Sequence, residues 1–334
     1  MRHSHAALQL LGPVWSAVTI LGPSFHKLGM PLLVAMDFVS DADSRAVQLL
    51  ASLGYKPKPR DTALDRFAAL YTRAERIIPP VPYEVRLSDK IQQNPKYRSH
   101  RKAFDEIVSR LRNGQSVRPY LSTLAVRAAF QDTLLLTWGI HHLHLNTIDT
   151  LDKRGFVARR RGASELLLLR IKEQTAYLID IVSHDEPDLF DNPRLLEVVD
   201  RNWPELHFAA KSITGEAFTP QQVKSLRSNH ANFAIQINGR TVLPTVGVTA
   251  TGVPIEVYGW YWALHAELRN VEANVRHRFY EFFPHSISPS QNWRAINVVR
   301  LVGIEDAYFI LQDQATLRLS HAHRVAAQKR EVVA

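Results

Sequence analysis

The stretch Glu165-Leu-Leu-Leu-Leu-Arg-Ile-Lys-Glu-Gln-Thr-Ala-Tyr-Leu-Ile-Asp-Ile-Val182 contains two apolar runs separated by Lys172-Glu-Gln174. Each run has the length of a β-strand and is nearly continuous in Leu, Ile and Val, as strands are when both faces of a sheet are covered. The sequence therefore predicts a hairpin of two central strands. The connecting tripeptide contains no glycine, so the sequence leaves the turn type open.

A histidine-rich run, Leu134-Leu-Leu-Thr-Trp-Gly-Ile-His-His-Leu-His-Leu-Asn146, precedes this hairpin. We expect a buried helix over 124–136, a corner at Trp138-Gly139 and then an extended strand. Alternation along that strand places Ile140, His142 and His144 on one face. Two imidazoles on one face can share a metal ion, a phosphate group or a proton relay.

Patterns elsewhere in the chain predict both helices and strands. Apolar periodicity and capping residues predict helices over 41–54, 61–77, 92–114 with a basic face, 193–203, 219–227 and 260–283. A hairpin is expected over 232–243 with a type I′ turn at Asn238-Gly239, and closing strands over 296–302, 307–311 and 315–319. The predicted class is α+β: an N-terminal helical region, a small, mostly antiparallel central sheet with flanking helices, and a C-terminal α+β segment.

The predicted organisation has three parts: a poorly ordered extension over 1–36, helices and the central sheet over 37–205, and a C-terminal domain over 206–334. Residues 6–25 carry no charge, which raises the alternative of a targeting segment. The pairs Gly12-Pro13 and Gly22-Pro23 break this run, so we favour an extension translated from an upstream start codon.

Composition restricts the partners and the chemistry. The 334 residues include 41 Lys and Arg against 32 Asp and Glu, a formal charge of +9, which favours an anionic partner such as nucleic acid, with RNA preferred. There is no cysteine, which excludes disulfides and thiolate zinc sites and fits a cytoplasmic protein. We expect no association with a membrane, and the sequence does not indicate an oligomeric state.

The histidines suit RNA cleavage without a cofactor. Transesterification of RNA needs a base, an acid and cations for the phosphate, and imidazole and guanidinium groups supply these. We expect His142 and His144 to act as acid and base, with His184 as a supporting catalytic group. The predicted substrate-binding cations are Lys153, Arg159, Arg160, Arg161 and Arg170.

A helix followed by a small antiparallel sheet carrying His, Arg and Lys resembles the ribonuclease fold of RelE-type mRNA interferases and EndoU-type enzymes. The resemblance covers about residues 120–205 and rests on element order and residue type. It implies a metal-independent endoribonuclease of the kind found in bacterial toxins and phage-defence effectors.

Two other classes of function stay open. His142 and His144 with Asp149 could bind a divalent metal ion in a metal-dependent hydrolase or nuclease. Alternatively, the histidines are structural and the chain is a non-catalytic nucleic-acid-binding module. A serine hydrolase is excluded for Ser183-His184-Asp185, because consecutive side chains diverge along a strand and cannot form a triad.

Overall fold

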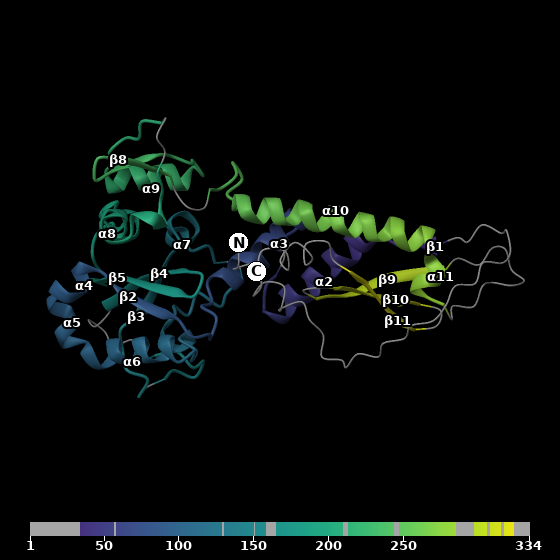
Figure 1. Ribbon diagram of the computed structural model, residues 1–334, viewed down its shortest axis with the longest axis horizontal. Helices are drawn as coiled ribbons and strands as arrows, with labels where there is room; N and C mark the ends of the chain where they lie inside the picture. Colours follow the sequence, from purple (N-terminus) through teal and green to yellow (C-terminus); the bar gives the residue numbers. More distant parts are fainter. Residues whose placement is uncertain are drawn as a thin grey trace, which may run out of the picture. The chain divides into compact units, whose positions relative to one another are not determined.

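The computed structural model describes residues 34–323, apart from residues 57, 129, 150, 158–164, 210–212, 244–246, 285–296, 306–307 and 315–316. The described residues have an α+β fold (Figure 1). They form two compact units: one spans Tyr71–Tyr258, and the other combines the chain up to Leu70 with the chain from Gly259 onward. The chain changes unit within α3 (Ala63–Glu75) and within α10 (Ile255–His277).

The first unit is built on a four-stranded sheet of order β2-β5-β4-β3. Its strands are β2 (Glu84–Leu87), β3 (Ile140–His144), β4 (Glu165–Lys172) and β5 (Thr175–Ser183). The predicted hairpin is present, and Lys172 pairs with Thr175, so its loop is two residues long. Glu173 in that loop has φ 54°. Strand β2, which runs parallel to β5, was not predicted; its four residues are too few to show a clear pattern.

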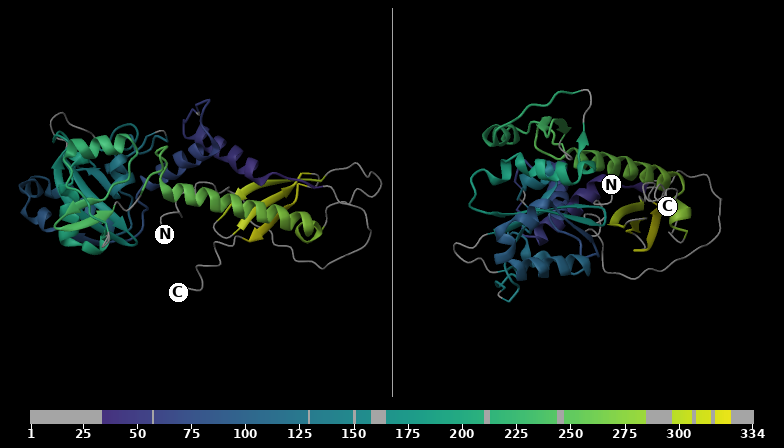
Figure 2. Two further views of the ribbon diagram at one scale, coloured as in Figure 1. Left: turned by 90° about the horizontal axis from the view of Figure 1, so that it is seen from above. Right: turned by 60° about the vertical axis from the view of Figure 1, so that its left-hand side comes forward.

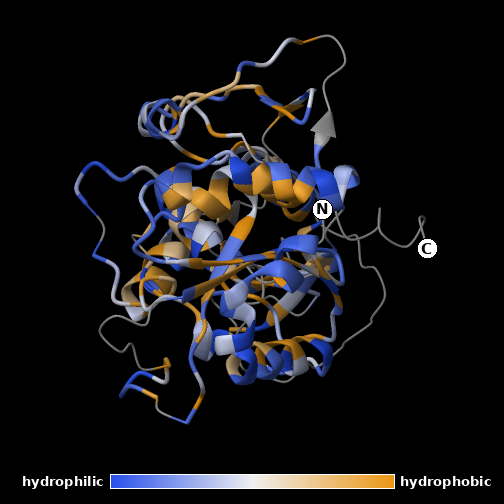
Figure 3. Cartoon of the chain, turned by 90° about the vertical axis from the view of Figure 1, so that its left-hand side faces the viewer, coloured by the Kyte–Doolittle hydropathy of each residue, from blue (hydrophilic) through white to orange (hydrophobic). Residues whose placement is uncertain are grey.

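One face of this sheet is covered by α4 (Asp89–Gln93), α5 (Pro95–Ser99) and α6 (Arg101–Arg112). Phe104, Ile107 and Leu111 of α6 belong to the same buried core as strand residues such as Leu143 and Leu167. These helices replace the single helix predicted over 92–114. The break falls at Asn94, whose side chain accepts a hydrogen bond from the Lys96 N–H and caps α5, because Pro95 cannot donate within a helix. The helices of this unit carry both hydrophobic and hydrophilic stripes (Figure 3).

The opposite face is covered by α7 (Thr133–Trp138), η2 (Leu189–Asp191), α8 (Arg194–Asn202) and η3 (Pro204–Leu206). A small sheet of order β6-β8-β7 packs into the same core, formed by β6 (Phe208–Ala209), β7 (Ile235–Ile237) and β8 (Arg240–Leu243). Ile235, Ile237 and Val242 join Leu168 and Val199 in that core. This shared core runs through the boundary predicted near 205, so the compact unit continues to Tyr258.

Two further elements complete the unit, η1 (Arg118–Tyr120) and α9 (Pro220–Ser228). Helix α9 begins with a capping box between Thr219 and Gln222. The β7–β8 turn has positive φ at Asn238 (48°) and Gly239 (75°), the backbone of the predicted type I′ turn. The predicted helix over 124–136 is reduced to α7, and the residues before it form turns.

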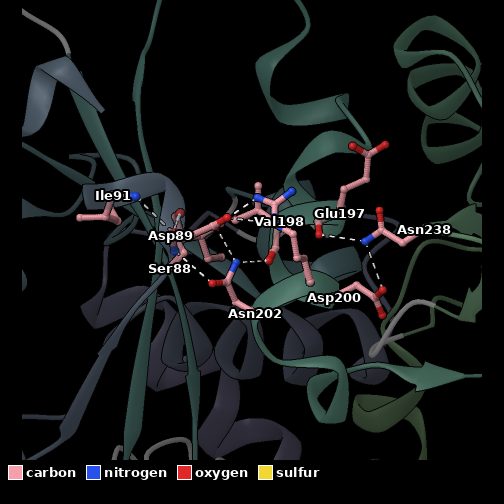
Figure 4. A network of polar contacts seen from close by, with 10 residues as sticks. Ser88, Asp89, Ile91, Glu197, Val198, Asp200, Asn202 and Asn238 are labelled. Carbon is pink, nitrogen blue, oxygen red and sulfur yellow. Dashed lines mark hydrogen bonds and ion pairs between the residues drawn. The ribbon is translucent and has the colours of Figure 1, made fainter. Parts of the chain in front are cut away.

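Polar side chains tie α4 and the small sheet to α8 (Figure 4). Asp89 at the start of α4 accepts hydrogen bonds from Arg201 and Asn202, and its own N–H donates to the Asn202 side chain. Asn238 in the β7–β8 turn donates to the Glu197 carbonyl and to Asp200, both at 3.2 Å. Helix α8 is thus held by hydrogen bonds at its middle and at its C-terminal end.

The second unit contains a sheet of order β1-β9-β10-β11. Figure 2 shows its C-terminal strands in yellow. Its strands are β1 (Val34–Ala35), β9 (Asn297–Ile304), β10 (Tyr308–Asp313) and β11 (Leu319–His323). Helices α2 (Phe38–Ser52), α10 and α11 (Phe279–Phe282) accompany it. The predicted helix over 260–283 begins earlier, at Ile255, and is interrupted after His277. In the part of the chain that the structure describes, no helix is long and apolar enough to cross a bilayer.

Candidate imidazole site

Strand β3 carries its histidines as the alternation predicted. His142 and His144 lie opposite Leu168 and Leu166 of β4, on the face that also holds Ile140 in the core beneath α7 and α8. The His142 side chain is 12% exposed and His144 is 6% exposed. Both rings are therefore almost covered, and contact with a substrate requires an additional, more accessible group.

His184 supplies an accessible imidazole at the end of β5. Its ring lies 6.4 Å from the His144 ring, nearly parallel at 20°, and the His142 and His144 rings are also 6.4 Å apart. Phe190 of η2 contacts both outer members, at 5.5 Å from His142 and 5.9 Å from His184. We call His142, His144, His184 and Phe190 the imidazole cluster. The structure thus brings together the three histidines chosen from sequence, and the His184 side chain is 45% exposed.

Asp132 orients His142 and was not identified from sequence. One carboxylate oxygen accepts the Leu135 N–H at 3.1 Å and caps α7, while the other lies 3.6 Å from Nδ1 of His142. The sequence does contain a signal for this residue: Asp132 stands immediately before Thr133-Leu-Leu-Leu, where an Asp side chain can cap a helix. Because the cap fixes the position of the carboxylate, it also fixes the group that faces the His142 ring.

A small hollow lies along β3, the edge strand of its sheet, and is lined by residues that include Arg76, Ser122, Asp132, His141 and His142. Arg76 is 2% exposed and donates hydrogen bonds to the carbonyls of Ala125 at 3.0 Å, Arg127 at 2.7 Å and Phe130. Burial lowers the pKa of Arg76 to about 10, because the charged form loses its hydration. Arg76 thereby holds the turns before α7 in place beside the hollow.

Arg227 of α9 positions the other side of the imidazole cluster. Its guanidinium donates to the Phe190 carbonyl and to Asp191 at 2.8 Å, and it lies 3.8 Å from the centre of the Trp138 ring. Its side chain is only 3% exposed, and burial lowers its pKa. Arg227 therefore joins α7, α9 and η2, and it fixes Phe190 against the two histidines.

Of the predicted substrate-binding cations, only Lys153 and Arg170 lie within the described residues, and they differ in exposure. Arg159, Arg160 and Arg161 lie outside the described residues, and the described chain resumes at Glu165, which pairs with Ser183 beside His184. Lys153 is exposed in a turn between Leu151 and Val157. Arg170 pairs with Ile140, at the other end of β3 from His144, and is 6% exposed. This burial does not suit a phosphate ligand, so we leave Arg170 out of the site.

Arg170 instead lies near a polar cluster in which Asp200 and His207 are buried and Asn238 and Arg240 are more exposed. Nδ1 of His207 lies 3.6 Å from Asp200, and Arg240 lies 3.1 Å from the same carboxylate. The pKa of His207 is lowered to about 4, first because burial penalises the charged ring and second because Arg170 repels it. His207 is therefore neutral at pH 7, and the cluster holds the small sheet to α8.

The alternative metal site is not assembled by the described residues. Asp149 accepts a hydrogen bond from the Lys102 ammonium group at 2.8 Å and is 60% exposed. Within the described ranges no group of three or more His, Asp or Glu side chains is arranged to hold a metal ion. His142, His144 and Asp149 thus do not form the ligand set that the sequence suggested.

No protein-family model, curated protein or solved structure matches this chain.

Proposed function

We propose that this protein binds RNA and cleaves it by metal-independent transesterification at the imidazole cluster. The observation that carries the proposal is the convergence of three histidines from two strands at one end of the sheet. Their rings are spaced at 6.4 Å, and one of them is half-exposed. Apolar surroundings without function rarely collect three imidazoles, because each ring brings polar atoms that must be satisfied.

The chemistry requires two proton transfers. A base removes the proton of the ribose 2′-hydroxyl, whose oxygen attacks the phosphorus. An acid protonates the departing 5′-oxygen, which leaves a 2′,3′-cyclic phosphate and a 5′-hydroxyl. His184 is the accessible ring and is assigned to one transfer. His144 lies against it and is assigned to the other, while Asp132 holds His142 behind them.

Phosphate binding is assigned to cations that the sequence places nearby. Lys153 is exposed, and Arg159 to Arg161 shortly precede Glu165 in the chain. The formal charge of +9 supports attraction of a polyanion. A role in a toxin system or in phage defence rests on the sequence resemblance alone and stays part of the proposal.

Purified protein incubated with end-labelled RNA, with and without EDTA, tests the proposal. We expect cleavage that EDTA does not reduce and that ends in a cyclic phosphate. His184→Asn is expected to lower the rate at least about 100-fold, within the range of one acid–base group. His230→Asn is the matched control, because His230 is exposed, lies outside the imidazole cluster and has φ 55°, which Asn tolerates.

A non-catalytic RNA-binding module is the second candidate, favoured by the low exposure of His142 and His144. Under this alternative the same assay gives RNA binding that weakens with salt and no cleavage product. Cleavage abolished by EDTA would instead support a metal-dependent enzyme. Either result would overturn the proposed mechanism.

A further inference from the structure

We propose that α5 and the first turn of α6 bind the sugar–phosphate backbone of RNA and lead it to the imidazole cluster. Four basic residues form this surface, Lys96, Arg98, Arg101 and Lys102, and we call them the α5–α6 basic surface. The inference rests on the proposed function for the identity of its ligand. It goes beyond that function because it adds a binding surface on two helices to the cations already assigned.

The positive charge of the chain is concentrated around these helices. Residues 90–118 contain eight Lys and Arg against two acidic residues, and therefore hold +6 of the formal charge of +9. The side chains of Lys102 and Arg101 are 74% and 67% exposed, Arg98 is exposed, and Lys96 is 35% exposed. A cluster of accessible cations of this kind attracts a polyanion.

Packing fixes the side to which these charges point. Phe104 and Ile107 of α6 are buried in the core that α6 shares with the central sheet. Tyr97 of α5 lies edge-on against Phe104, with 4.9 Å between the ring centres. Because the apolar sides of both helices are buried, their basic side chains face away from the sheet.

Helix α5 lies at the same end of the sheet as the imidazole cluster. Nζ of Lys96 is 3.9 Å from the carboxylate of Glu165, the first residue of β4. Glu165 pairs with Ser183 of β5, and His184, the accessible imidazole, is the next residue. A strand of RNA held at Lys96 therefore has only the width of one strand pair to cross before it reaches His184.

Helix α6 begins at this end and runs away from it. Lys102 in its first turn donates a hydrogen bond at 2.8 Å to Asp149, in the chain that follows β3. The carbonyl of Leu111, near the other end of α6, accepts the N–H of Tyr83 at 2.9 Å, just before β2 begins. The start of α6 is thus the part nearest the imidazole cluster.

The charges at the start of α6 do not serve the stability of the helix. Its first turn carries Arg101 and Lys102 and contains no acidic residue. The N-terminus of a helix has a partial positive charge, so cations are unfavourable there. The acids beside these cations, Asp105 and Asp149, form exposed ion pairs, which contribute little and which a phosphate can replace. Cations at this position are expected where they bind a partner.

The surface favours RNA over an anionic membrane. None of the exposed large apolar side chains in the described part of the chain lies within residues 90–118. Helices that lie on a membrane insert apolar side chains between the lipids, and the α5–α6 basic surface offers none. Its position beside the imidazole cluster instead suits the substrate of that cluster.

Fluorescence polarisation with a short 2′-O-methyl RNA tests the surface, because this RNA has no free 2′-hydroxyl and is not cleaved by transesterification. Each phosphate contact to a single strand adds about 0.7 to the slope of log affinity against log salt. Arg98→Gln combined with Lys102→Gln should therefore lower the slope by about 1.4 and weaken binding about tenfold at about 0.15 M salt. Gln is as good a helix former as Lys and Arg, so the melting temperature should stay nearly unchanged.

The matched control removes the same charge from the opposite end of the sheet. Arg112→Gln combined with Lys172→Gln changes two exposed cations, one at the end of α6 and one that pairs with Thr175 at the start of β5. Binding should weaken less than about threefold, because long-range attraction is screened at this salt concentration. Equal effects of the two double variants would show that net charge alone attracts RNA, and would overturn the proposal. Vesicles of phosphatidylserine bound through Arg98 and Lys102, with RNA left unbound, would also overturn it.

Cleavage assays separate this inference from the proposed function. If both hold, the Arg98→Gln/Lys102→Gln variant should raise KM for cleavable RNA by about the factor seen in binding. Binding that depends on Arg98 and Lys102 in a chain that cleaves no RNA would remove the ribonuclease and leave the surface. Cleavage with a KM indifferent to both residues would leave the ribonuclease and remove the surface.

Discussion

Acidification should destabilise the first unit through His207. The His207 side chain is 2% exposed, and burial together with repulsion by Arg170 lowers its pKa to about 4 although Asp200 is nearby. An imidazole in the unfolded chain has a pKa near 6.5. The unfolded state therefore binds a proton first as the pH falls, and folding stability is lost between about pH 6.5 and pH 4.

The pKa difference sets the size of this loss. A difference of about 2.5 units, at about 1.4 kcal/mol per unit and with the folded ring half-protonated at pH 4, gives about 3 kcal/mol between pH 7 and pH 4. This is a large fraction of the stability of a typical domain. The sign is that of a base with a depressed pKa: the stabilisation is complete above the unfolded pKa and falls as the pH approaches the folded value.

Urea unfolding monitored by tryptophan fluorescence at pH 7, 6, 5 and 4 measures the effect. His207→Gln removes the titrating ring, so the stability of the variant should fall by about 3 kcal/mol less than that of the wild type over this range. The half-exposed His184 is the control, and His184→Gln should follow the wild-type curve. Parallel curves for wild type and His207→Gln would refute the reasoning, as would an NMR titration of the His207 ring with a midpoint near 6.5.

Two further substitutions test the site and the core. Asp132→Asn keeps a residue that caps helices well, so the free energy of unfolding should change by less than about 0.5 kcal/mol. The same substitution removes the carboxylate charge beside His142, so RNA cleavage should fall about tenfold or more. Unchanged cleavage would show that Asp132 does not serve the imidazole cluster. Leu168→Ala opens a cavity at a fully buried position of β4 and should cost about 2–5 kcal/mol in urea unfolding, and a smaller loss would mean that the sheet relaxes around it.

The imidazole cluster was partly predictable from sequence. Alternation alone placed His142 and His144 on one face, and the end of the second predicted strand placed His184 nearby. Phe190 and Arg227 had no such signal, because Phe190 follows β5 in an irregular segment and Arg227 is distant in sequence from Phe190 and Trp138, which it contacts. Their contacts depend on how α9 and η2 pack against α7, and local patterns carry no information about that packing.

Arg170 shows the limit of residue type as a guide. The sequence shows it as a cation on a predicted strand, and we predicted that it binds substrate. It instead pairs with Ile140 and Tyr177, is 6% exposed, and its charge acts on the buried His207. Whether a charged strand residue meets solvent or a buried partner is decided by the elements that cover the sheet.

Local sequence patterns predict the class of fold, the central hairpin, the type I′ turn at Asn238-Gly239 and the face on which the β3 histidines lie. Each of these depends on residues close together in the chain, because side-chain alternation and backbone preference are local properties. Two features follow only from the folded chain: the unit extends beyond residue 205, and Asp132, Arg76 and Arg227 surround the imidazole cluster. Those features depend on apolar surfaces from distant segments burying one another, and that burial has no local signature.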